Sequence, residues 1–225
     1  MRILICSATP FEIAPLLNHL SENFTAVSDF HFKKGELEVL VLVTGVGSTF
    51  TALRLGNLLG RERFELAVNA GIAGAFNRDL KMGEVVNVIS ERFADLGVEE
   101  ADGKFTDVHE LDLISSNEPP FQNGELLNLS AAEFDFLPKC KGLTVNKVHG
   151  FLPNIEAIQN KYPADAESME GAAFFLACLL ANLPFLEVRA ISNHVEPRNR
   201  EAWDLPLAIE NLNEVLINLV NSFLG

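Results

Sequence analysis

Arg2-Ile3-Leu4-Ile5-Cys6-Ser7-Ala8 opens the chain as an apolar run that stops before Pro10 and Glu12. The run is too short to span a membrane or to form the apolar core of a signal peptide. Its apolar residues are consecutive and do not alternate with polar ones, which is typical of a strand buried on both faces. We therefore interpret residues 2–7 as the first strand of an α/β core.

Further apolar runs rich in Val, Ile and Leu follow, with helical patterns between and after several of them. The expected strands are residues 2–7, 37–43, 65–69, 84–89, 143–148 and 185–191. The expected helices are residues 11–21, 48–60, 171–182 and 205–223. Strands that alternate with helices build a parallel or mixed sheet with helices packed outside it. The sequence therefore predicts a three-layer α/β/α fold with a central mixed sheet, as a single domain over residues 1–225.

The charge balance argues against one class of partner. The chain has 17 Lys and Arg residues against 31 Asp and Glu residues, a formal net charge of −14. Nucleic-acid affinity comes largely from basic side chains that neutralise phosphates, so we expect no nucleic-acid partner. The three cysteines lack Cys-x-x-Cys spacing, which favours free thiols in a reducing compartment. We expect a cytoplasmic protein that does not associate with membranes.

Residues 93–142 lack a clear period and carry turn signals such as Pro119-Pro120 and Asn123-Gly124, so no element is assigned there. The acidic cluster Glu99-Glu100-Ala101-Asp102 is interpreted as a solvated loop face rather than a metal site. The five histidines show no paired ligand spacing. Neither a metal nor another cofactor is expected.

Two glycine-containing stretches follow predicted strands. Gly45-Val46-Gly47 matches the first two glycines of a dinucleotide-binding motif, but Phe50 stands where the third glycine of that motif belongs. We interpret it as a tight turn at a strand end, a place that often lines a ligand site. The second stretch is Asn69-Ala70-Gly71-Ile72-Ala73-Gly74, whose small residues allow backbone amides to approach a ligand closely.

Three polar features also lie at or just beyond predicted strand ends. Glu170 precedes a long apolar helix, where a carboxylate is favoured by the helix dipole alone. Arg189-Ala190-Ile191-Ser192-Asn193 ends an apolar strand, where open α/β sheets bind ligands, although Ser192 and Asn193 also suit a helix N-cap. Glu12 follows the first strand at a position that is usually exposed. Each feature alone has a plain structural interpretation.

Together, these features resemble the ordered motifs of the purine nucleoside phosphorylase and methylthioadenosine nucleosidase superfamily. The resemblance covers nearly the whole chain except about residues 93–142. Residues 168–173, Ser-Met-Glu-Gly-Ala-Ala, together with Ile191-Ser192-Asn193, are most similar to futalosine hydrolases. That resemblance implies an N-glycosyl hydrolase of menaquinone biosynthesis, which releases hypoxanthine from futalosine and forms a homo-oligomer.

The resemblance assigns a role to each matching residue. Glu12 would activate the attacking water, Glu170 would accept the ribose hydroxyls, and Met169 would pack under the sugar. Asn193 would hold the purine at its N7 edge. As the glycosidic bond breaks, the ribose becomes oxocarbenium-like and the purine gains negative charge, so groups at these two places stabilise the transition state. A carboxylate beside the water can act as general base.

Other residues are expected to bind the rest of the substrate. Ile72, Ala73 and Gly74 would line the pocket, and Phe151 and Leu152 would enclose the base. Trp203 would cover the 5′ substituent. The benzoate of futalosine needs a charged partner, and Arg198 or Arg200 would supply it, unless Glu196 and Glu201 pair with both arginines. Arg189 is expected to support the site.

Departures from the family pattern refine the expectation. Asn193 stands where adenine-specific relatives carry an aspartate, and its amide can serve a 6-oxopurine such as hypoxanthine. Asn69 and Ile72 stand where phosphorylases carry an arginine and a serine of their anion site, which favours water as the nucleophile. A methylthioadenosine or S-adenosylhomocysteine nucleosidase, a phosphorylase and a non-catalytic nucleoside-binding module remain as alternatives.

Overall fold

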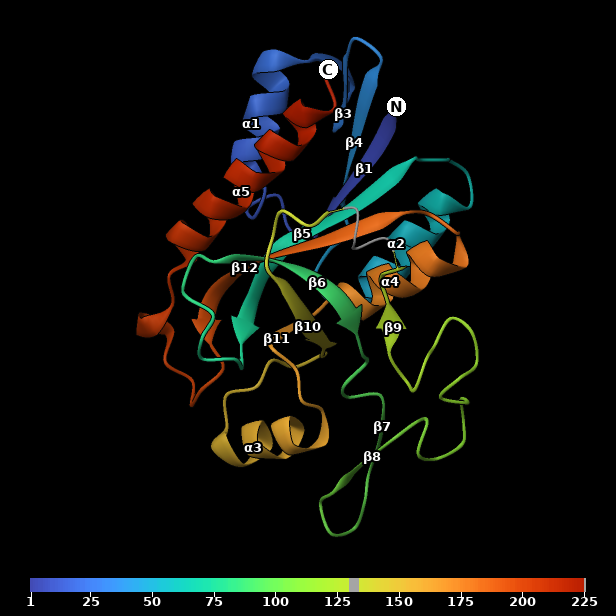
Figure 1. Cartoon of the computed structure of the whole chain (residues 1–225), viewed down its shortest axis with the longest axis vertical. Coiled ribbons are helices and arrows are strands. Elements are labelled where there is room, and N and C mark those ends of the chain that lie inside the picture. The colour runs from blue at the N-terminus through green and yellow to red at the C-terminus, as the bar shows by residue number, and fades with distance from the viewer. Residues whose placement is uncertain (130–133, 225) are drawn as a thin grey trace.

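The computed structural model of the chain describes residues 1–129 and 134–224. Its centre is a twisted sheet with helices on both sides (Figure 1). Residues 130–133 and Gly225, which the single-domain prediction included, lie outside the described part of the chain. No helix among the described residues is long and apolar enough to cross a membrane.

The sheet contains ten of the strands, and two short strands pair separately. The ten are β1 (Arg2–Ser7), β2 (Thr25–Ser28), β3 (His31–Lys34), β4 (Leu37–Val43), β5 (Leu66–Ala75), β6 (Val85–Glu91), β9 (Leu126–Leu127), β10 (Lys139–Thr144), β11 (Ala166–Ser168) and β12 (Phe185–His194). The separate pair is β7 (Gly97–Glu99) and β8 (Phe105–Asp107). The helices are α1 (Ala14–Asn23), α2 (Ser48–Leu59), α3 (Leu152–Lys161), α4 (Gly171–Leu180) and α5 (Leu205–Ser222), with a short 3-10 helix η2 (Arg200–Ala202).

The strands pair in the order β11-β10-β6-β12-β5-β1-β4-β3-β2. β1, β4, β5 and β12 are parallel, whereas β6 is antiparallel to β12. β11 pairs with β10 on one side and with the end of β5 on the other, which closes a ring of five strands. The sheet is therefore mixed, and the ends of β1, β5, β11 and β12 come close together.

Two apolar layers hold the helices to the sheet. α1 and α5 cover one face and α2 and α4 the other (Figure 1). Leu16 of α1 and Leu216 of α5 are completely buried in the first layer, and Leu55 of α2 and Phe174 of α4 in the second. Burying one such side chain stabilises the fold by about 1.5–3 kcal/mol. The two layers together hold the strands, and therefore their ends, in fixed positions.

The predicted fold class is confirmed, and several predicted boundaries are wrong. The strand predicted at residues 65–69 continues to Ala75, and the one predicted at 185–191 continues to His194. Glycine and alanine remain in the strand because β12 runs beside β5 to its end and supplies the pairing partners. The strand predicted at 143–148 is instead β10, which ends at Thr144. The motifs 69–74 and 189–193 therefore lie inside strands and not beyond them.

The first helix also begins later than predicted. α1 starts at Ala14 and not at residue 11, with a proline in its first turn. The residues between β1 and α1 form a tight turn in which Ile13 donates its backbone N–H to the carbonyl of Pro10. Residues 93–142, left unassigned from the sequence, contribute β7, β8, β9 and the start of β10.

Candidate active site

The turn after β1 holds the carboxylate of Glu12 in a fixed orientation. Thr9 donates to one carboxylate oxygen from its backbone N–H, at 3.0 Å, and from its hydroxyl, at 2.8 Å. The other oxygen accepts the backbone N–H of Ile72 in β5, at 3.2 Å. All three groups donate, so both oxygens of this buried carboxylate are fixed as acceptors.

Helix α5 anchors the backbone of the same turn. The side-chain amide of Asn213 donates to the carbonyl of Glu12 at 2.8 Å, and its oxygen accepts the backbone N–H of Leu16 at 3.0 Å. Asn213 is buried, and buried amides are stable only when they are paired in this way. The loop that carries Glu12 is thus tied to the last helix of the chain.

Glu170 occupies the N-cap position of α4, but its side chain does not cap that helix. Instead Oε1 accepts the backbone N–H of Gly47 at 2.9 Å, and the hydroxyl of Ser48 donates to the carbonyl of Met169 at 3.2 Å. Burial raises the pKa of the Glu170 carboxyl, and the charge of Arg189 opposes that effect. The turn before α2 therefore positions Glu170. The interpretation of Glu170 as a helix cap did not predict this contact.

Arg189 lies close to both carboxylates and is buried. Its Nη2 atom is 3.7 Å from Oε2 of Glu170 and has no hydrogen-bond partner among the described residues. A Cβ atom on Gly71 would lie 2.2 Å from Nη1 of Arg189 and 3.0 Å from Oε1 of Glu12, so these groups converge over β5 where it lacks a side chain. An unpaired buried guanidinium N–H is costly, and a hydroxyl or water bound beside Glu170 would satisfy it.

The end of β12 places Asn193 beside β5. Asn193 stands opposite Gly74, where a Cβ atom would lie 3.1 Å from Nδ2 of Asn193. The hydroxyl of Ser192 donates to Oδ1 at 2.9 Å, and Nδ2 donates to the carbonyl of His194 at 3.0 Å. The half-buried amide is therefore held in one orientation at the open end of the strand.

β11 brings the Met169–Glu170 segment to the same place. Glu167 of β11 stands opposite Gly74 in the antiparallel pairing with β5. Met169, Ile72 and Gly74 are half-buried, whereas Ala73 is buried. Through these pairings the structure gathers most of the predicted residues at one end of the sheet. These are Glu12, Ile72, Ala73, Gly74, Met169, Glu170 and Asn193.

Phe151 and Leu152 lie at the start of α3 and are largely exposed. Phe151 is the N-cap residue, 64% exposed, and its carbonyl accepts the backbone N–H of Asn154 and Ile155 as the helix begins. Leu152 is 49% exposed. No hydrogen bond among the described residues joins Phe151 or Leu152 to Glu12 or Glu170. An exposed aromatic side chain beside a site is free to cover a bound group.

The segment after β12 lies beside the start of α3. The backbone N–H of Arg198 donates to the carbonyl of Gly150 at 3.1 Å. The guanidinium of Arg198 lies 5.2 Å from the ring centre of Trp203, a cation–π contact. Arg200 is exposed at the start of η2. Within the described residues neither arginine forms an ion pair. Glu196, one of the two expected partners, pairs instead with Arg78 at 3.1 Å.

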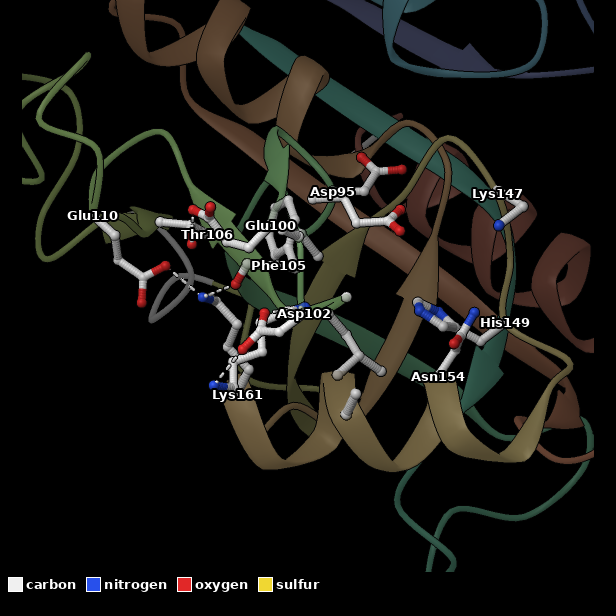
Figure 2. Close-up of a pocket in the computed structure, with 17 residues that line it drawn as sticks. Asp95, Glu100, Asp102, Phe105, Thr106, Glu110, Lys147, His149, Asn154 and Lys161 are labelled. Atoms are coloured by element: carbon white, nitrogen blue, oxygen red, sulfur yellow. Dashed lines mark hydrogen bonds and ion pairs between the residues drawn. The ribbon is translucent and has the colours of Figure 1, made fainter.

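A large open cavity in the described part of the chain does not coincide with this site. It has a volume of about 1060 Å³ and lies between α3 and the segment that carries β7 and β8 (Figure 2). Acidic side chains and lysines line it, and His149 stands at one end (Figure 2). Its lining includes neither Glu12 nor Glu170. The predicted solvated cluster Glu99-Glu100-Ala101-Asp102 forms part of its rim and is exposed.

Sequence interpretation missed two buried carboxylates behind the site, Glu187 and Glu91. Glu187 accepts Nε of Arg189 at 2.8 Å. A signal was available, because Glu187 lies in an otherwise apolar strand two residues before Arg189. Residues at that spacing share a face of a strand, and a buried charge requires a partner.

A family model described as the phosphorylase superfamily matches residues 2–224 of this chain. The futalosine hydrolase of Acidothermus cellulolyticus is 33% identical over 184 residues, which cover 80% of this chain and 74% of that protein. The 5′-methylthioadenosine/S-adenosylhomocysteine nucleosidase of Glaesserella parasuis is 27% identical over 240 residues, covering 99% of this chain and all of that protein.

A solved structure has the same fold. The 5′-methylthioadenosine/S-adenosylhomocysteine nucleosidase of Colwellia psychrerythraea, in complex with adenine, superposes with a TM-score of 0.78. The match covers 98% of this chain and 95% of that one, at 21% identity. At this identity the likeness establishes the shared architecture alone.

Proposed function

The chain belongs to the phosphorylase superfamily, and on that premise we propose that it hydrolyses the N-glycosidic bond of a purine nucleoside, with futalosine as the substrate. One observation carries the proposal: the carboxylates of Glu12, after β1, and Glu170, after β11, flank the buried guanidinium of Arg189 in β12. Carboxylates at two sides of one small site suit the cleavage of a bond that leaves positive charge on a sugar.

In the proposed mechanism the sugar lies against Glu170 and the water against Glu12. Glu170 accepts the ribose hydroxyls and stabilises the oxocarbenium-like sugar, a contribution on the order of 2–4 kcal/mol for one preorganised group. Glu12 takes a proton from the water that attacks C1′. The unpaired Nη2 of Arg189 is a donor available on the same side. The purine leaves with the electron pair of the broken bond and gains a proton from solvent, and Glu12 returns to solvent the proton that it took from the attacking water.

Water is the better nucleophile for this site than phosphate. A phosphate ion needs free donors, usually backbone amides and arginine side chains. Here the backbone N–H of Ile72 is already donated to Glu12, and the N–H of Gly47 to Glu170. Two buried carboxylates beside these amides would also repel an anion. These contacts support hydrolysis over phosphorolysis.

Two features favour futalosine among purine nucleosides. The amide of Asn193 can both donate and accept, which suits a 6-oxopurine such as hypoxanthine. Arg198 and Arg200 are cations without a described carboxylate partner, and Arg198 stacks on Trp203. A benzoate at the 5′ end of the substrate would give such an arginine a planar anionic partner. In this proposal Trp203, Phe151 and Leu152 cover the bound nucleoside.

The second candidate is hydrolysis of 5′-methylthioadenosine or S-adenosylhomocysteine. It is favoured by the relative from Glaesserella parasuis, which this chain matches over its full length. The futalosine hydrolase of Acidothermus cellulolyticus has the higher identity but the lower coverage. The two candidates differ in the base that they release and in the charge of the 5′ group.

A homo-oligomer is part of the proposal. Phe11, Val46 and Phe50 expose roughly half or more of their side chains next to Glu12 and the Gly47 turn. Exposed apolar groups that gather beside a site often mark a contact with another subunit. Light scattering on the purified chain would test this prediction.

The deciding experiment is incubation with futalosine, inosine and methylthioadenosine, with and without phosphate, followed by separation of the free bases. We expect hypoxanthine from futalosine at a rate that phosphate does not change. Faster release of adenine from methylthioadenosine would favour the second candidate. A ribose 1-phosphate product would contradict hydrolysis, and the absence of any released base would indicate a binding module.

A further inference from the structure

Two carboxylates that the proposed mechanism does not use lie directly behind Arg189. Glu187 is completely buried in β12 and accepts Nε of Arg189 at 2.8 Å, while Asn69 approaches the same oxygen at 3.4 Å. Its other oxygen has no partner among the described residues. Glu91, at the end of β6, is also buried and accepts the hydroxyl of Thr144 at 2.7 Å. Burying a carboxylate whose oxygens are not all paired lowers the stability of the fold, so the presence of Glu187 in this strand calls for an explanation.

Three glycines leave the space that this group of side chains occupies. A Cβ atom on Gly171 would lie 2.1 Å from Oε1 of Glu91 and 2.8 Å from Oε1 of Glu187, so these two oxygens are close neighbours. A Cβ atom on Gly142 would lie 2.3 Å from the same oxygen of Glu91. Gly71 makes room for Arg189 in the same way. Backbone on β5, β10 and α4 is thus shaped around the charged groups.

The titratable groups around Glu187 come from several neighbouring strands and from helix α4. Arg189 of β12 is its ion-pair partner and Glu91 of β6 is the adjacent carboxyl group. Glu170 lies across Arg189, and the thiols of Cys140 and Cys178 interact with Glu187 from β10 and α4. Burial raises the pKa of Glu187 to about 7, although Arg189 opposes the shift. Burial and the charge of Glu187 raise the pKa of Glu91 well above its ordinary value.

We propose that Glu187 is a positioning residue of the active site, which acts through Arg189, and that Glu91 remains its neutral, proton-bearing neighbour. This inference rests on the proposed hydrolytic function. Ionised Glu187 fixes the guanidinium with a charge-assisted hydrogen bond, so that Nη2 faces Glu170. Glu91 avoids a second buried negative charge because two carboxylates this close do not both ionise readily.

The proposal predicts how activity responds to pH. Ionisation of Glu187 strengthens the hold on Arg189, so kcat/KM should rise as the pH passes through about 7, the pKa of Glu187. In Glu187→Gln the amide oxygen still accepts Nε but cannot ionise. The rise near pH 7 should therefore disappear.

The test compares kcat and KM between pH 5 and 9 for wild type, Glu187→Gln and Glu187→Met. Methionine fills similar space but accepts no hydrogen bond, and a misplaced guanidinium should lower kcat by about 100-fold with little change in KM. Asp107→Asn is the matched control, because Asp107 is a buried carboxylate that pairs with Tyr162 at the far end of α3. The control should keep the wild-type pH profile. An unchanged profile in Glu187→Gln, or equal uniform losses in both Glu187 variants, would overturn the inference.

Thermal unfolding gives a readout that needs no activity. A carboxyl whose pKa is raised in the native state loses stabilisation as the pH rises from its unfolded value toward the native one, here from about 4.5 to about 7. The difference in Tm between Glu187→Gln and wild type should therefore grow in favour of the variant over that range. A wild type that cleaves no nucleoside would reject the proposed function alone. A Tm difference that does not vary with pH would reject the inference.

Discussion

The backbone N–H of Ile72 donates to the carboxylate of Glu12 across 3.2 Å, although the two residues lie 60 positions apart in the chain. The contact joins the turn after β1 to the second half of β5, where glycine and alanine residues leave the backbone accessible. It gives the proposed general base a fixed direction before any substrate binds. It also occupies the backbone N–H of Ile72, which is then not available to a phosphate ion.

Glu12→Gln should abolish hydrolysis while the chain remains folded. The amide is nearly isosteric with the carboxylate but cannot take a proton from water, so we expect a loss of at least about 100- to 10,000-fold in kcat. Its NH₂ group would also face a donor, at Thr9 or at Ile72, which should lower stability by about 1–3 kcal/mol. Single-turnover kinetics and circular dichroism separate the two effects. Turnover close to wild type would remove Glu12 from the mechanism.

Glu170→Gln should lower kcat/KM by about 100- to 1,000-fold, the usual effect of removing one preorganised electrostatic group. The glutamine oxygen can still accept the N–H of Gly47, so the turn before α2 should stay in place. The loss should shrink for a substrate that lacks the ribose hydroxyls, because that substrate never made the contact. An equal loss on the intact and the deoxy substrate would mean that Glu170 does not bind those hydroxyls.

Gly71→Ala should impair both folding and activity. The added methyl group would meet Nη1 of Arg189 at 2.2 Å, and overpacking of this kind costs about 1–3 kcal/mol. A displaced guanidinium would lose its place beside Glu170, so we also expect kcat to fall. Gly56→Ala is the matched control: it adds a methyl group to an exposed position of α2 with no heavy atom within 4 Å, and it should leave activity unchanged. Denaturant unfolding and initial rates on both variants check the prediction, which equal behaviour of the two would refute.

Replacement of Arg198 or Arg200 by methionine should weaken futalosine more than its uncharged carboxamide analogue. Only the carboxylate has an ion pair to lose, and we expect the difference to appear in KM. Because Arg198 also stacks on Trp203, its loss should carry a small extra effect on both compounds. Equal losses on the two substrates, or none on either, would show that neither arginine recognises the carboxylate.

The three cysteines should be unreactive in the native protein. Cys6, Cys140 and Cys178 are all buried, and burial raises the pKa of each thiol, so little reactive thiolate forms. A thiol reagent such as dithionitrobenzoate should label none of them rapidly at pH 8 and all three after denaturation in guanidinium chloride. Rapid labelling of one thiol in the native state would show local opening around that strand or helix.

Sequence patterns predict the layers of this fold better than the ends of its strands. Continuous apolar runs identify β1 and β4 to the residue, because β1 is buried on both faces and β4 is buried on one face and half-buried on the other. The same patterns end β5 too early, because its last residues are glycine and alanine, which are kept extended only by the neighbouring β12 and β11. Pairing between distant segments is not visible in local composition.

The site shows the same division. Polar residues beside apolar strands draw attention to Glu12 and Glu170, and the resemblance to the ordered motifs of the family supplies their expected roles, which stay predictions. Gly47 contacts Glu170, Asn213 contacts the Glu12 turn, and Glu187 contacts Arg189. Gly47 and Asn213 lie far from their partners in sequence, and Glu187 is buried in a strand. The contacts of Gly47 and Asn213 depend on tertiary packing, so one sequence alone could not reveal them, whereas the spacing of Glu187 from Arg189 was a signal in the sequence.

The hydrogen bonds between Asn213 and the Glu12 turn bear on the order of events during synthesis. A ribosome delivers residue 12 some two hundred residues before residue 213, so the turn has no anchor while most of the chain is being made. β12, which separates β5 from β6, also arrives late. A nascent chain halted before α5 would therefore carry every proposed catalytic side chain and still lack the contact that fixes the Glu12 turn, so catalytic competence should arise only after α5 has been synthesised.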